Sequence, residues 1–491
     1  MRTGLDYRSS LRDGRRVWVM NTGLVEDVVT HPATAGMVAE YVSWYDRHLD
    51  PAWGATLLTD AGEPVWGVLP RSAADLKRMG ASYAATTFIN AGNVTHTPAY
   101  GHLIALGIET TARAYGKFPA QIENAAAYRK TIAANGRFLT FSSGAATIGA
   151  RLHPDPASRN ALRVVRETPE GLFISGKVGM HTSPAYAEDV YVGANSACDH
   201  NGHRVTFVTP INASGVTVLC RKVSVRDANP FVSPLSARND ELDGQMWLDN
   251  VFVPNERLYF LDANVDPIAR WLFWHQLYCW LAKGEFALGL GLALADAMGL
   301  ARHGPTIELL IDMITDVQTV RTCLVAAELD PMMTPEGYCY PNHNHIAVGS
   351  IAMLNARQRL TETLRILPGS SLIVAPSDRD LDSPEVGAGL EESFGGGGYT
   401  ARQRAALLQT AWDHIGSSLD ARESVYELHA NGGIPIWRAR LRRSFGRYNE
   451  LANAVLKEIA LPMPAVDVSS IPDAPMMPRR QVAQQDGSGP K

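Results

Sequence analysis

The hydrophobic periodicity of this chain changes twice along its length, and the order of these changes constrains the fold more than any other feature. From about Thr34 to Asn135, apolar residues recur at helical spacing. From about Phe138 to Phe260, short β-branched and alternating runs are separated by Gly, Asn, Asp or Pro, which is typical of antiparallel strands. From about Pro267 to Glu458, long helical patterns return. The sequence therefore predicts a helical region, then a β barrel or sandwich, then a bundle of long helices.

These changes also set the expected domain boundaries. We expect an N-terminal helical domain over 1–136, a β-barrel domain over 137–265, a C-terminal helical bundle over 266–465 and a disordered tail over 466–491. The end of the chain, PDAPMMPRRQVAQQDGSGPK, is too polar and proline-rich to bury a core. A mainly α protein with a central β domain and a C-terminal four-helix bundle has the acyl-CoA dehydrogenase-like layout. That fold usually holds a flavin between barrel and bundle, although a fold alone does not fix the chemistry.

Composition excludes several classes of protein. A net charge of −5 from 45 basic and 50 acidic residues provides no field for a nucleic acid. The five cysteines are scattered, without a CxxC pair or zinc spacing, and the N-terminus has no apolar segment behind its charges, so we expect a reduced cytoplasmic location. The most apolar stretch, Ile268 to Leu300, carries charged side chains that are costly in a bilayer, so it is interpreted as a buried core helix.

Five ordered blocks resemble one protein family. The segment YRSSLRDGRRVWVMNTGLVEDVVTHPATAG is similar to the opening of the 4-hydroxyphenylacetate 3-monooxygenase oxygenase family. The other four blocks are THTPAY at 95–100, SARNDELDGQMWLDNVFVPNERLYFLDA at 236–263, LPGSSLIVAPSDRDL at 367–381 and AWDHIGSSLDARESVYELH at 411–429. The resemblance implies the oxygenase component of a two-component flavin monooxygenase. Such an enzyme takes reduced FAD from a separate NAD(P)H flavin reductase and uses oxygen to hydroxylate a small aromatic, phenolic substrate.

This chemistry makes two physical demands on the site. It must stay dry, because water promotes the loss of hydrogen peroxide before oxygen is transferred. It must also activate the substrate, since a phenol reacts far better as phenolate, and a base or donor beside the hydroxyl lowers its pKa. We further expect a homotetramer, because the apolar helices expected at 268–300 and 306–328 offer more hydrophobic face than one bundle needs.

The first candidate site lies in the second block. Family members read R-T-P-D-Y, where this chain has His96-Thr97-Pro98-Ala99-Tyr100, so His96 replaces the arginine and Tyr100 is retained. An isolated histidine at a helix start is usually structural, but its place in the motif favours function. A neutral imidazole can accept a phenol proton near pH 7, whereas a guanidinium can only donate. We predict His96 and Tyr100 as catalytic and substrate-binding residues that emerge on one side of a starting helix.

The second candidate site departs from the family as well. The family's L-N-H, whose histidine touches flavin and substrate, aligns with Leu139-Thr140-Phe141. Phe141 is predicted as an apolar wall opposite His96 and Tyr100, and a one-residue slip brings Ser142 into its place, so both are predicted to bind substrate. The loss of the arginine and the histidine argues against 4-hydroxyphenylacetate itself. A differently substituted aromatic is expected, from secondary metabolism or aromatic catabolism.

The resemblance implies three further segments that contact the flavin. They are the small-residue loop in FSSGAATIGAR, the strand end Met180-His181-Thr182-Ser183, and a turn at 416–419 that matches the family's G-S-E-F. The predicted cofactor-binding residues are Ser143, Gly144, Thr147, Gly149, His181, Thr182, Ser183, Gly416, Ser417, Ser418 and Leu419. The hydroxyls at 182 and 183 equally fit a strand-end turn. Arg238, Arg422 and Glu423 could serve the FAD phosphates or adenine across subunits, or form ordinary ion pairs.

Other functions remain open from sequence. A dehydratase of the 4-hydroxybutyryl-CoA type would need an iron–sulfur cluster, for which His275 and Cys279 are available but no N-terminal pair is. No metal site is therefore predicted. An acyl-CoA dehydrogenase would need a catalytic carboxylate over the substrate. Hydroxylation of an amine nitrogen and a helical assembly protein without flavin are the remaining alternatives.

Overall fold

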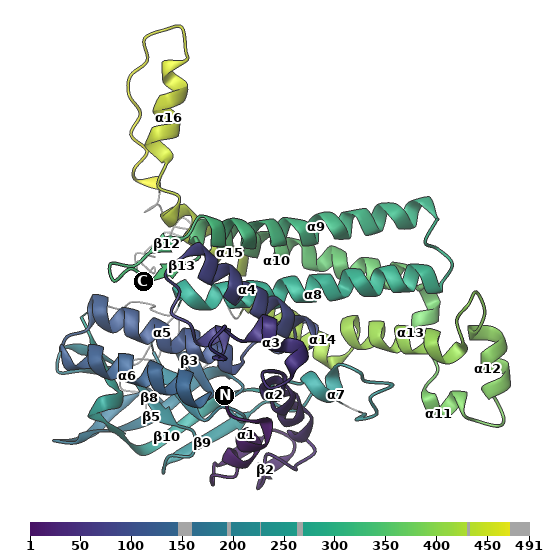
Figure 1. Cartoon of the computed structure of the whole chain (residues 1–491), viewed down its shortest axis with the longest axis horizontal. Coiled ribbons are helices and arrows are strands. Elements are labelled where there is room, and N and C mark those ends of the chain that lie inside the picture. The colour runs from purple at the N-terminus through teal and green to yellow at the C-terminus, as the bar shows by residue number, and fades with distance from the viewer. Residues whose placement is uncertain (146–159, 194–197, 226, 263–268, 430–432, 472–491) are drawn as a thin grey trace, which may run out of the picture.

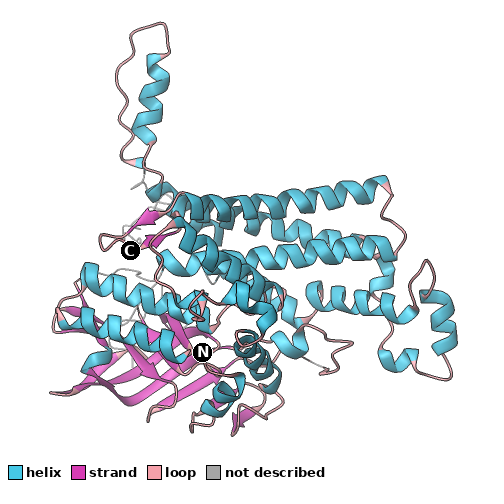
Figure 2. Ribbon diagram, viewed as in Figure 1, coloured by secondary structure: helices cyan, strands magenta, loops and turns pink. Residues whose placement is uncertain are grey.

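The computed structural model describes residues 1–145, 160–193, 198–225, 227–262, 269–429 and 433–471. Figure 1 shows a sheet on one side of the molecule and long helices on the other, and Figure 2 shows that helices cover the sheet where the two meet. The N-terminal helices are α1 (Gly4–Ser10), α2 (Ala35–Arg47), α3 (Pro51–Leu57), the 3-10 helix η1 (Val65–Gly67), α4 (Ala73–Phe88), α5 (Pro98–Tyr115) and α6 (Ala120–Asn135).

The central sheet follows the alternating runs of the sequence. Its strands are β1 (Val17–Val19), β2 (Gly23–Val25), β3 (Leu139–Ala145), β4 (Arg163–Thr168), β5 (Gly171–Thr182), β6 (Asp189–Val192), β7 (Cys198–His200), β8 (His203–Pro210), β9 (Val216–Cys220), β10 (Asp243–Pro254) and β11 (Leu258–Leu261). The order is β11-β8-β6-β3-β5-β10-β9-β1-β2, with β4 on β5 and β7 on β8. Most pairs are antiparallel, as expected, but β1 with β9 and β3 with β6 are parallel.

One N-terminal segment differs from the expected helical domain. β1 and β2 form a short hairpin, and β1 pairs with β9 through the register Val17 with Val218 and Val19 with Cys220. The side chains of Val17 and Val19 point into the core and are fully buried. The first part of the chain therefore contributes to the β domain, because its alternating apolar residues complete the edge of the sheet.

The C-terminal part is a bundle of long helices. It contains α8 (Ala269–Ala297), α9 (Gly304–Leu329), α10 (His343–Ile366), α13 (Ala401–Ile415), α14 (Ser418–His429) and α15 (Gly433–Ser444), and α8, α9 and α10 pack side by side (Figure 1). The remaining elements are α7 (Ser236–Asn239), α11 (Asp378–Leu381), α12 (Gly387–Phe394), α16 (Tyr448–Lys457), the 3-10 helices η3 (Asn255–Arg257) and η4 (Gly369–Leu372), and the hairpin of β12 (Met332–Met333) and β13 (Cys339–Tyr340).

The most apolar helix, α8, is the centre of the packing. Within the described residues it is the one helix long and apolar enough to cross a membrane, and 67% of its apolar window is buried inside the protein. It contacts α4 and α5 on one side and α9 and α10 on the other. The fully buried Trp271 and Trp274 belong to the same core as the strands. The most apolar stretch, despite its charged side chains, is thus a core helix that joins the N-terminal helices to the bundle.

Candidate active site

His96 stands directly before the start of α5. Thr97 is the N-cap of this helix and accepts the backbone N–H of Tyr100 at 3.3 Å, and Pro98 takes the first helical position. Starting the helix here places Tyr100 one turn beyond His96. Their rings stack with centroids 4.3 Å apart and an interplanar angle of 23°, and both side chains are buried. The structure therefore brings the two predicted catalytic residues together on one side of the helix start.

Phe141 joins the same stack. Its ring lies 5.7 Å from that of His96 and 6.2 Å from that of Tyr100. A glycine makes this approach possible, because a Cβ on Gly101 would lie 2.7 Å from the carbonyl oxygen of Leu139. Without a side chain there, α5 lies directly on β3. We expected Phe141 to form an opposite wall, but the structure places it beside His96 and leaves no space for a ring between the two.

The hydrogen bonds of His96 define its tautomer. Nδ1 lies 3.0 Å from the hydroxyl oxygen of Thr140 and 3.2 Å from the carbonyl oxygen of Thr182. The Thr140 hydroxyl itself donates to the same carbonyl at 2.7 Å, so its proton is already used. A carbonyl oxygen can only accept, which assigns the proton of His96 to Nδ1. Nε2 consequently carries a lone pair and is the atom that can accept a substrate proton.

Burial sets the charge of His96. The side chain is 3% exposed, and burial lowers the pKa of His96 from 6.5 to about 3. The imidazole is therefore neutral at pH 7 and can act as an acceptor. An anion beside Nε2 stabilises the imidazolium, because opposite charges at short range favour the charged form of both groups. A bound phenolate would thus raise the pKa of His96, which burial alone lowers.

A second histidine completes the aromatic cluster. The ring of His275, on α8, meets the ring of Tyr100 edge to face at 5.3 Å. Its Nδ1 contacts the thiol of Cys279 at 3.6 Å, and its Nε2 is buried without a partner. Burial lowers the pKa of His275 to about 3. Sequence reasoning considered His275 and Cys279 only as cluster ligands, and their spacing of four residues on one helix was the signal that they share a face.

The predicted flavin loop is described only in part. Thr147 and Gly149 lie outside the described residues, and of Ser143 only the backbone is described. Ser142 is buried and donates to the carbonyl oxygen of Gly179 at 3.2 Å, so its hydroxyl faces β5. Gly144 pairs with Gly179 across the two strands. Two opposing glycines leave this part of the sheet without side chains, which allows a planar ring to approach the backbone.

His181 lies beside those glycines. It pairs with Ser142 across β3 and β5 and is fully buried, and among the described residues neither ring nitrogen has a partner with hydrogen-bond geometry. Burial lowers the pKa of His181 to about 4, so the ring is neutral. A buried polar group of this kind can bind a ligand that approaches the ring. The prediction of His181 as a cofactor residue therefore fits the geometry.

The next two residues have other partners. The Thr182 hydroxyl donates to Asp243 at 3.1 Å. The Ser183 hydroxyl donates to Glu241 at 2.9 Å and also contacts the hydroxyl of Tyr41 at 2.7 Å. Ser183 adopts a φ of +60°, which turns the chain sharply at the end of β5. Both hydroxyls thus serve the protein's own network, in line with the strand-end alternative.

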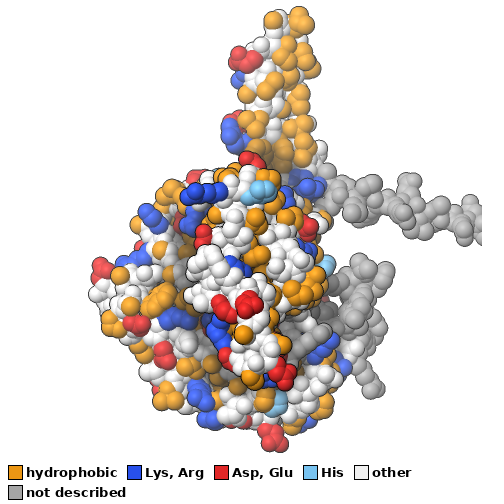
Figure 3. Space-filling model, turned by 90° about the vertical axis from the view of Figure 1, so that its right-hand side faces the viewer, with side chains coloured by type: hydrophobic (Ala, Val, Ile, Leu, Met, Phe, Trp, Pro, Cys, Tyr) orange, Lys and Arg blue, Asp and Glu red, His pale blue; other side chains and the backbone are white. Residues whose placement is uncertain are grey.

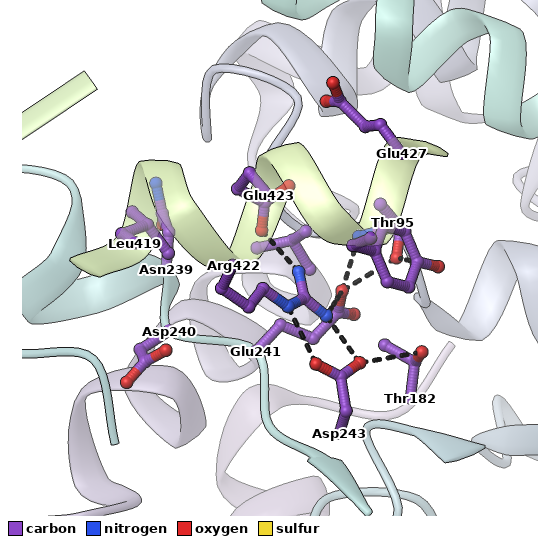
Figure 4. Close-up of polar contacts among 12 residues, drawn as sticks. Thr95, Thr182, Asn239, Asp240, Glu241, Asp243, Leu419, Arg422, Glu423 and Glu427 are labelled. Atoms are coloured by element: carbon purple, nitrogen blue, oxygen red, sulfur yellow. Dashed lines mark hydrogen bonds and ion pairs between the residues drawn. The ribbon is translucent and has the colours of Figure 1, made fainter. Parts of the chain in front are cut away.

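Arg422 is part of that network (Figure 4). Its guanidinium binds Asp243 with two bonds, Nε to Oδ2 at 2.8 Å and Nη2 to Oδ1 at 2.6 Å, and also contacts Glu423. Glu423 in turn pairs with Lys283 at 2.7 Å. Arg422 and Glu423 therefore form buried ion pairs within the chain, in line with the ion-pair alternative. Arg238 is exposed and donates to the backbone carbonyls of Pro234 and Ile89.

The predicted turn at 416–419 joins two helices. Gly416 ends α13, and the hydroxyl of Ser417 accepts the backbone N–H groups of Leu419 and Asp420 at the start of α14, where Ser418 is the first residue. Leu419 is buried against Ala91 and Leu235. It also borders a small cleft between α8, α10, α13 and α14. The polar residues lining the cleft are Asn93, Lys283, Arg357, Thr361, Asp413, His414, Asp420 and Glu423.

The structure groups the candidates into two places. His96, Tyr100, Phe141 and His275 form one aromatic cluster, and His181 with the paired glycines lies on the adjoining strands. The 416–419 turn belongs to the bundle, and its Leu419 packs against Ala91 on the connection that leads to His96. Among the described residues no group of three or more His, Cys, Asp or Glu side chains could hold a metal ion. The cluster can thus bind an aromatic ring and accept its proton, beside a strand pair suited to a planar cofactor.

Comparison with known proteins gives a consistent result. The N-terminal and C-terminal family models described as 4-hydroxyphenylacetate 3-hydroxylase match residues 3–260 and 267–457. The oxygenase component of 4-nitrophenol 4-monooxygenase/4-nitrocatechol 2-monooxygenase from Rhodococcus opacus is 27% identical and covers 90% of this chain and 87% of its own. The oxygenase component of 4-hydroxyphenylacetate 3-monooxygenase from Thermus thermophilus is also 27% identical, covering 93% and 98%. The crystal structure of such a component (HpaB) with FAD and 4-hydroxyphenylacetate superposes with a TM-score of 0.85 at 25% identity, covering 93% and 99%.

Proposed function

Because the chain belongs to the 4-hydroxyphenylacetate 3-hydroxylase family, we propose that it is the oxygenase component of a two-component flavin monooxygenase. It takes reduced FAD from a separate reductase and uses oxygen to hydroxylate a small phenolic substrate. The geometry of His96 carries this proposal, since its neutral Nε2 lone pair is directed away from the protein's own hydrogen bonds and its ring lies in an aromatic stack. When bound, reduced FAD supplies the activated oxygen, and His96 takes the phenol proton.

The residues present fit a flavin. The glycine pair on β3 and β5 and the unpartnered ring of His181 offer a flat backbone surface and an orphaned polar group at one place. The surrounding residues are buried, which excludes water from the reacting centre. We propose that the isoalloxazine lies against Gly144 and His181, and that Tyr100 and His275 line the neighbouring substrate space.

The substrate we propose is a phenol that carries no carboxylate. The arginine near His96, Arg422, is bound to Asp243 and Glu423, so it does not offer a partner to an acid. A phenol with an electron-withdrawing substituent fits best, because a histidine whose pKa is lowered to about 3 takes a proton more readily from an acidic phenol. The relative from Rhodococcus acts on such a compound. A single-turnover reaction with reduced FAD, oxygen and a phenol tests the function, and a hydroxylated product is expected.

We also propose that the protein works as a homotetramer in a reduced cytoplasm. All five cysteines are free thiols. The helix α16 and the loop that returns from it project from the body as an arm, and apolar side chains line this arm (Figure 3). Val455 is 63% and Leu461 is 69% exposed. The exposed face of α9, with Ile311 and Leu329, is a second apolar surface in the same bundle. Such surfaces favour contact with further copies of the chain.

Charging the arm should weaken this assembly. In the double variant Val455→Asp with Leu461→Asp, two carboxylates replace apolar side chains that a partner would bury. We expect light scattering to report a tetramer for the wild type at micromolar concentration and a smaller species for the double variant. Lys457→Asp, which changes charge on the same helix outside the apolar face, serves as the control and should remain tetrameric. A monomeric wild type would contradict the proposal.

A further inference from the structure

We propose that Glu241 is a positioning residue, which fixes His96 in the place and tautomer that hydroxylation requires. This inference rests on the proposed function. His96 lies in the connection between α4 and α5, outside any helix or strand, so the hydrogen bonds of neighbouring side chains must hold it. Its position is nevertheless defined at both backbone groups and at one ring nitrogen. Glu241 binds the N–H directly and lies beside Thr95, Asp243 and Arg422 (Figure 4).

The carboxylate of Glu241 is a shared acceptor for this connection. It is fully buried and accepts the backbone N–H of Thr95 at 3.0 Å, the hydroxyl of Thr95 at 2.7 Å and the backbone N–H of His96 at 2.8 Å. It also accepts the Ser183 hydroxyl at the end of β5. One side chain thus joins the segment that carries His96 to the strand end that follows Thr182.

The other backbone group of His96 is held from α2. The hydroxyl of Tyr41 donates to the carbonyl oxygen of His96 at 2.8 Å. The same hydroxyl lies 2.7 Å from that of Ser183 and 3.3 Å from the carboxylate of Glu241. The backbone N–H of His96 therefore binds Glu241 directly, and its C=O is connected to Glu241 through the hydroxyl of Tyr41.

The hydrogen-bond acceptor of the His96 ring is held by Asp243, two residues after Glu241. Nδ1 of His96 donates to the carbonyl oxygen of Thr182, and the Thr182 hydroxyl donates to Asp243. Asp243 is held by the two bonds from Arg422 on α14. The segment 241–243 consequently holds both partners of this hydrogen bond. Glu241 positions His96, the donor, and Asp243 positions Thr182, the acceptor. This arrangement keeps the proton on Nδ1 and the lone pair on Nε2.

A residue in the same fold provides a matched control. Asp413 is also buried and also accepts two consecutive backbone N–H groups, of Leu235 and Ser236, together with a hydroxyl from Ser236. It holds a connection that carries no member of the aromatic cluster. Asp413→Asn therefore changes such a carboxylate at a position that makes no direct contact with His96.

The test is a double-mutant cycle of Glu241→Gln and His96→Ala. The amide nitrogen of glutamine cannot accept the N–H groups of Thr95 and His96, so we expect His96 to shift slightly from its present position. With 4-nitrophenol as probe, we expect Glu241→Gln to lower product formation about tenfold to a hundredfold, as a small misplacement does. In the His96→Ala background it should have no further effect, because Glu241 acts through His96. Asp413→Asn should retain near wild-type product formation.

Two additional measurements keep the inference testable. Tyr41→Phe keeps the ring and removes the hydroxyl that donates to the His96 carbonyl and contacts Ser183 and Glu241, so it should show a smaller loss with the same dependence on His96 even if Glu241→Gln fails to fold. Binding of 4-nitrophenol to flavin-free protein should weaken equally in Glu241→Gln and in the double variant. Independent, additive losses, or an equal loss in Asp413→Asn, would overturn the positioning role. A wild type that binds 4-nitrophenol but hydroxylates no phenol would instead overturn the proposed function.

Discussion

Replacing His96 with alanine is expected to separate oxygen consumption from hydroxylation. The variant removes the Nε2 acceptor but leaves the glycine pair and His181, so reduced FAD should still bind and react with oxygen at nearly the normal rate. The loss of a general base slows the assisted step about a hundredfold to ten-thousandfold. Loss of peroxide then competes with hydroxylation, and product per reduced FAD should fall while hydrogen peroxide rises.

Tyr100→Phe provides the matched comparison for this effect. It keeps the stacked ring and removes only a hydroxyl, so its cost should correspond to one hydrogen bond, about 0.5–1.5 kcal/mol. Product and peroxide are measured in the same reaction for both variants. Unchanged coupling in His96→Ala would exclude His96 as the base, and His275, whose Nε2 is also unpartnered, would then be the residue to replace.

Acidification should destabilise the protein strongly between pH 7 and pH 5. Five buried histidines have a pKa lowered by burial to about 3 or about 4, and they are His48, His96, His102, His181 and His275. The unfolded chain binds protons at these positions below about pH 6.5, whereas the folded protein does not until the lower pKa is reached. The free energy of unfolding therefore decreases as the pH falls through this window.

The size of the effect follows from the same linkage. At pH 5 each histidine costs about 2 kcal/mol relative to neutral pH, and five together cost about 10 kcal/mol, which is comparable to the whole stability of a typical domain. We expect the melting temperature to fall steeply from pH 7.5 to pH 5. His102→Leu removes one such ring, both of whose nitrogens lack partners, and should make the fall smaller. A melting temperature independent of pH over this range would contradict the prediction.

Local sequence patterns predicted the strands whose structure depends on neighbouring residues in the chain. The runs ALRVVRET, GLFISGKV, DVYVGA, RVTFVTPI and GVTVLCRKV between 138 and 260 each contain a strand, because alternation and flanking turn residues encode a half-buried strand directly. The N-terminal hairpin was missed, since Val17 pairs with Val218 from a distant part of the chain. Such pairing depends on the completed sheet, and its three-residue strands are too short for periodicity to reveal.

Only those parts of the candidate site that depend on residues close together in the sequence could be predicted. The motif placed His96 and Tyr100 together because Pro98 starts a helix between them. The position of Phe141 depends on how closely α5 lies on β3, and that distance is set by the absence of a side chain at Gly101. The partners of Arg422 are just as non-local, because Asp243 belongs to a strand of the β domain. Residues that act through tertiary contacts are harder to find: Glu241 lies in the block at 236–263, but nothing in the block indicates its contact with His96.

The most direct measurement is a single turnover with chemically reduced FAD and no reductase. The purified protein, expected to be nearly colourless, is mixed with one equivalent of reduced FAD and with oxygen and 4-nitrophenol, and the product and peroxide are then quantified. We expect a hydroxylated phenol in nearly equal amount to the reduced FAD consumed, with further phenols compared in the same assay. Complete conversion of the reduced FAD to hydrogen peroxide with every phenol, or tightly bound yellow FAD that an acyl-CoA reduces, would contradict it.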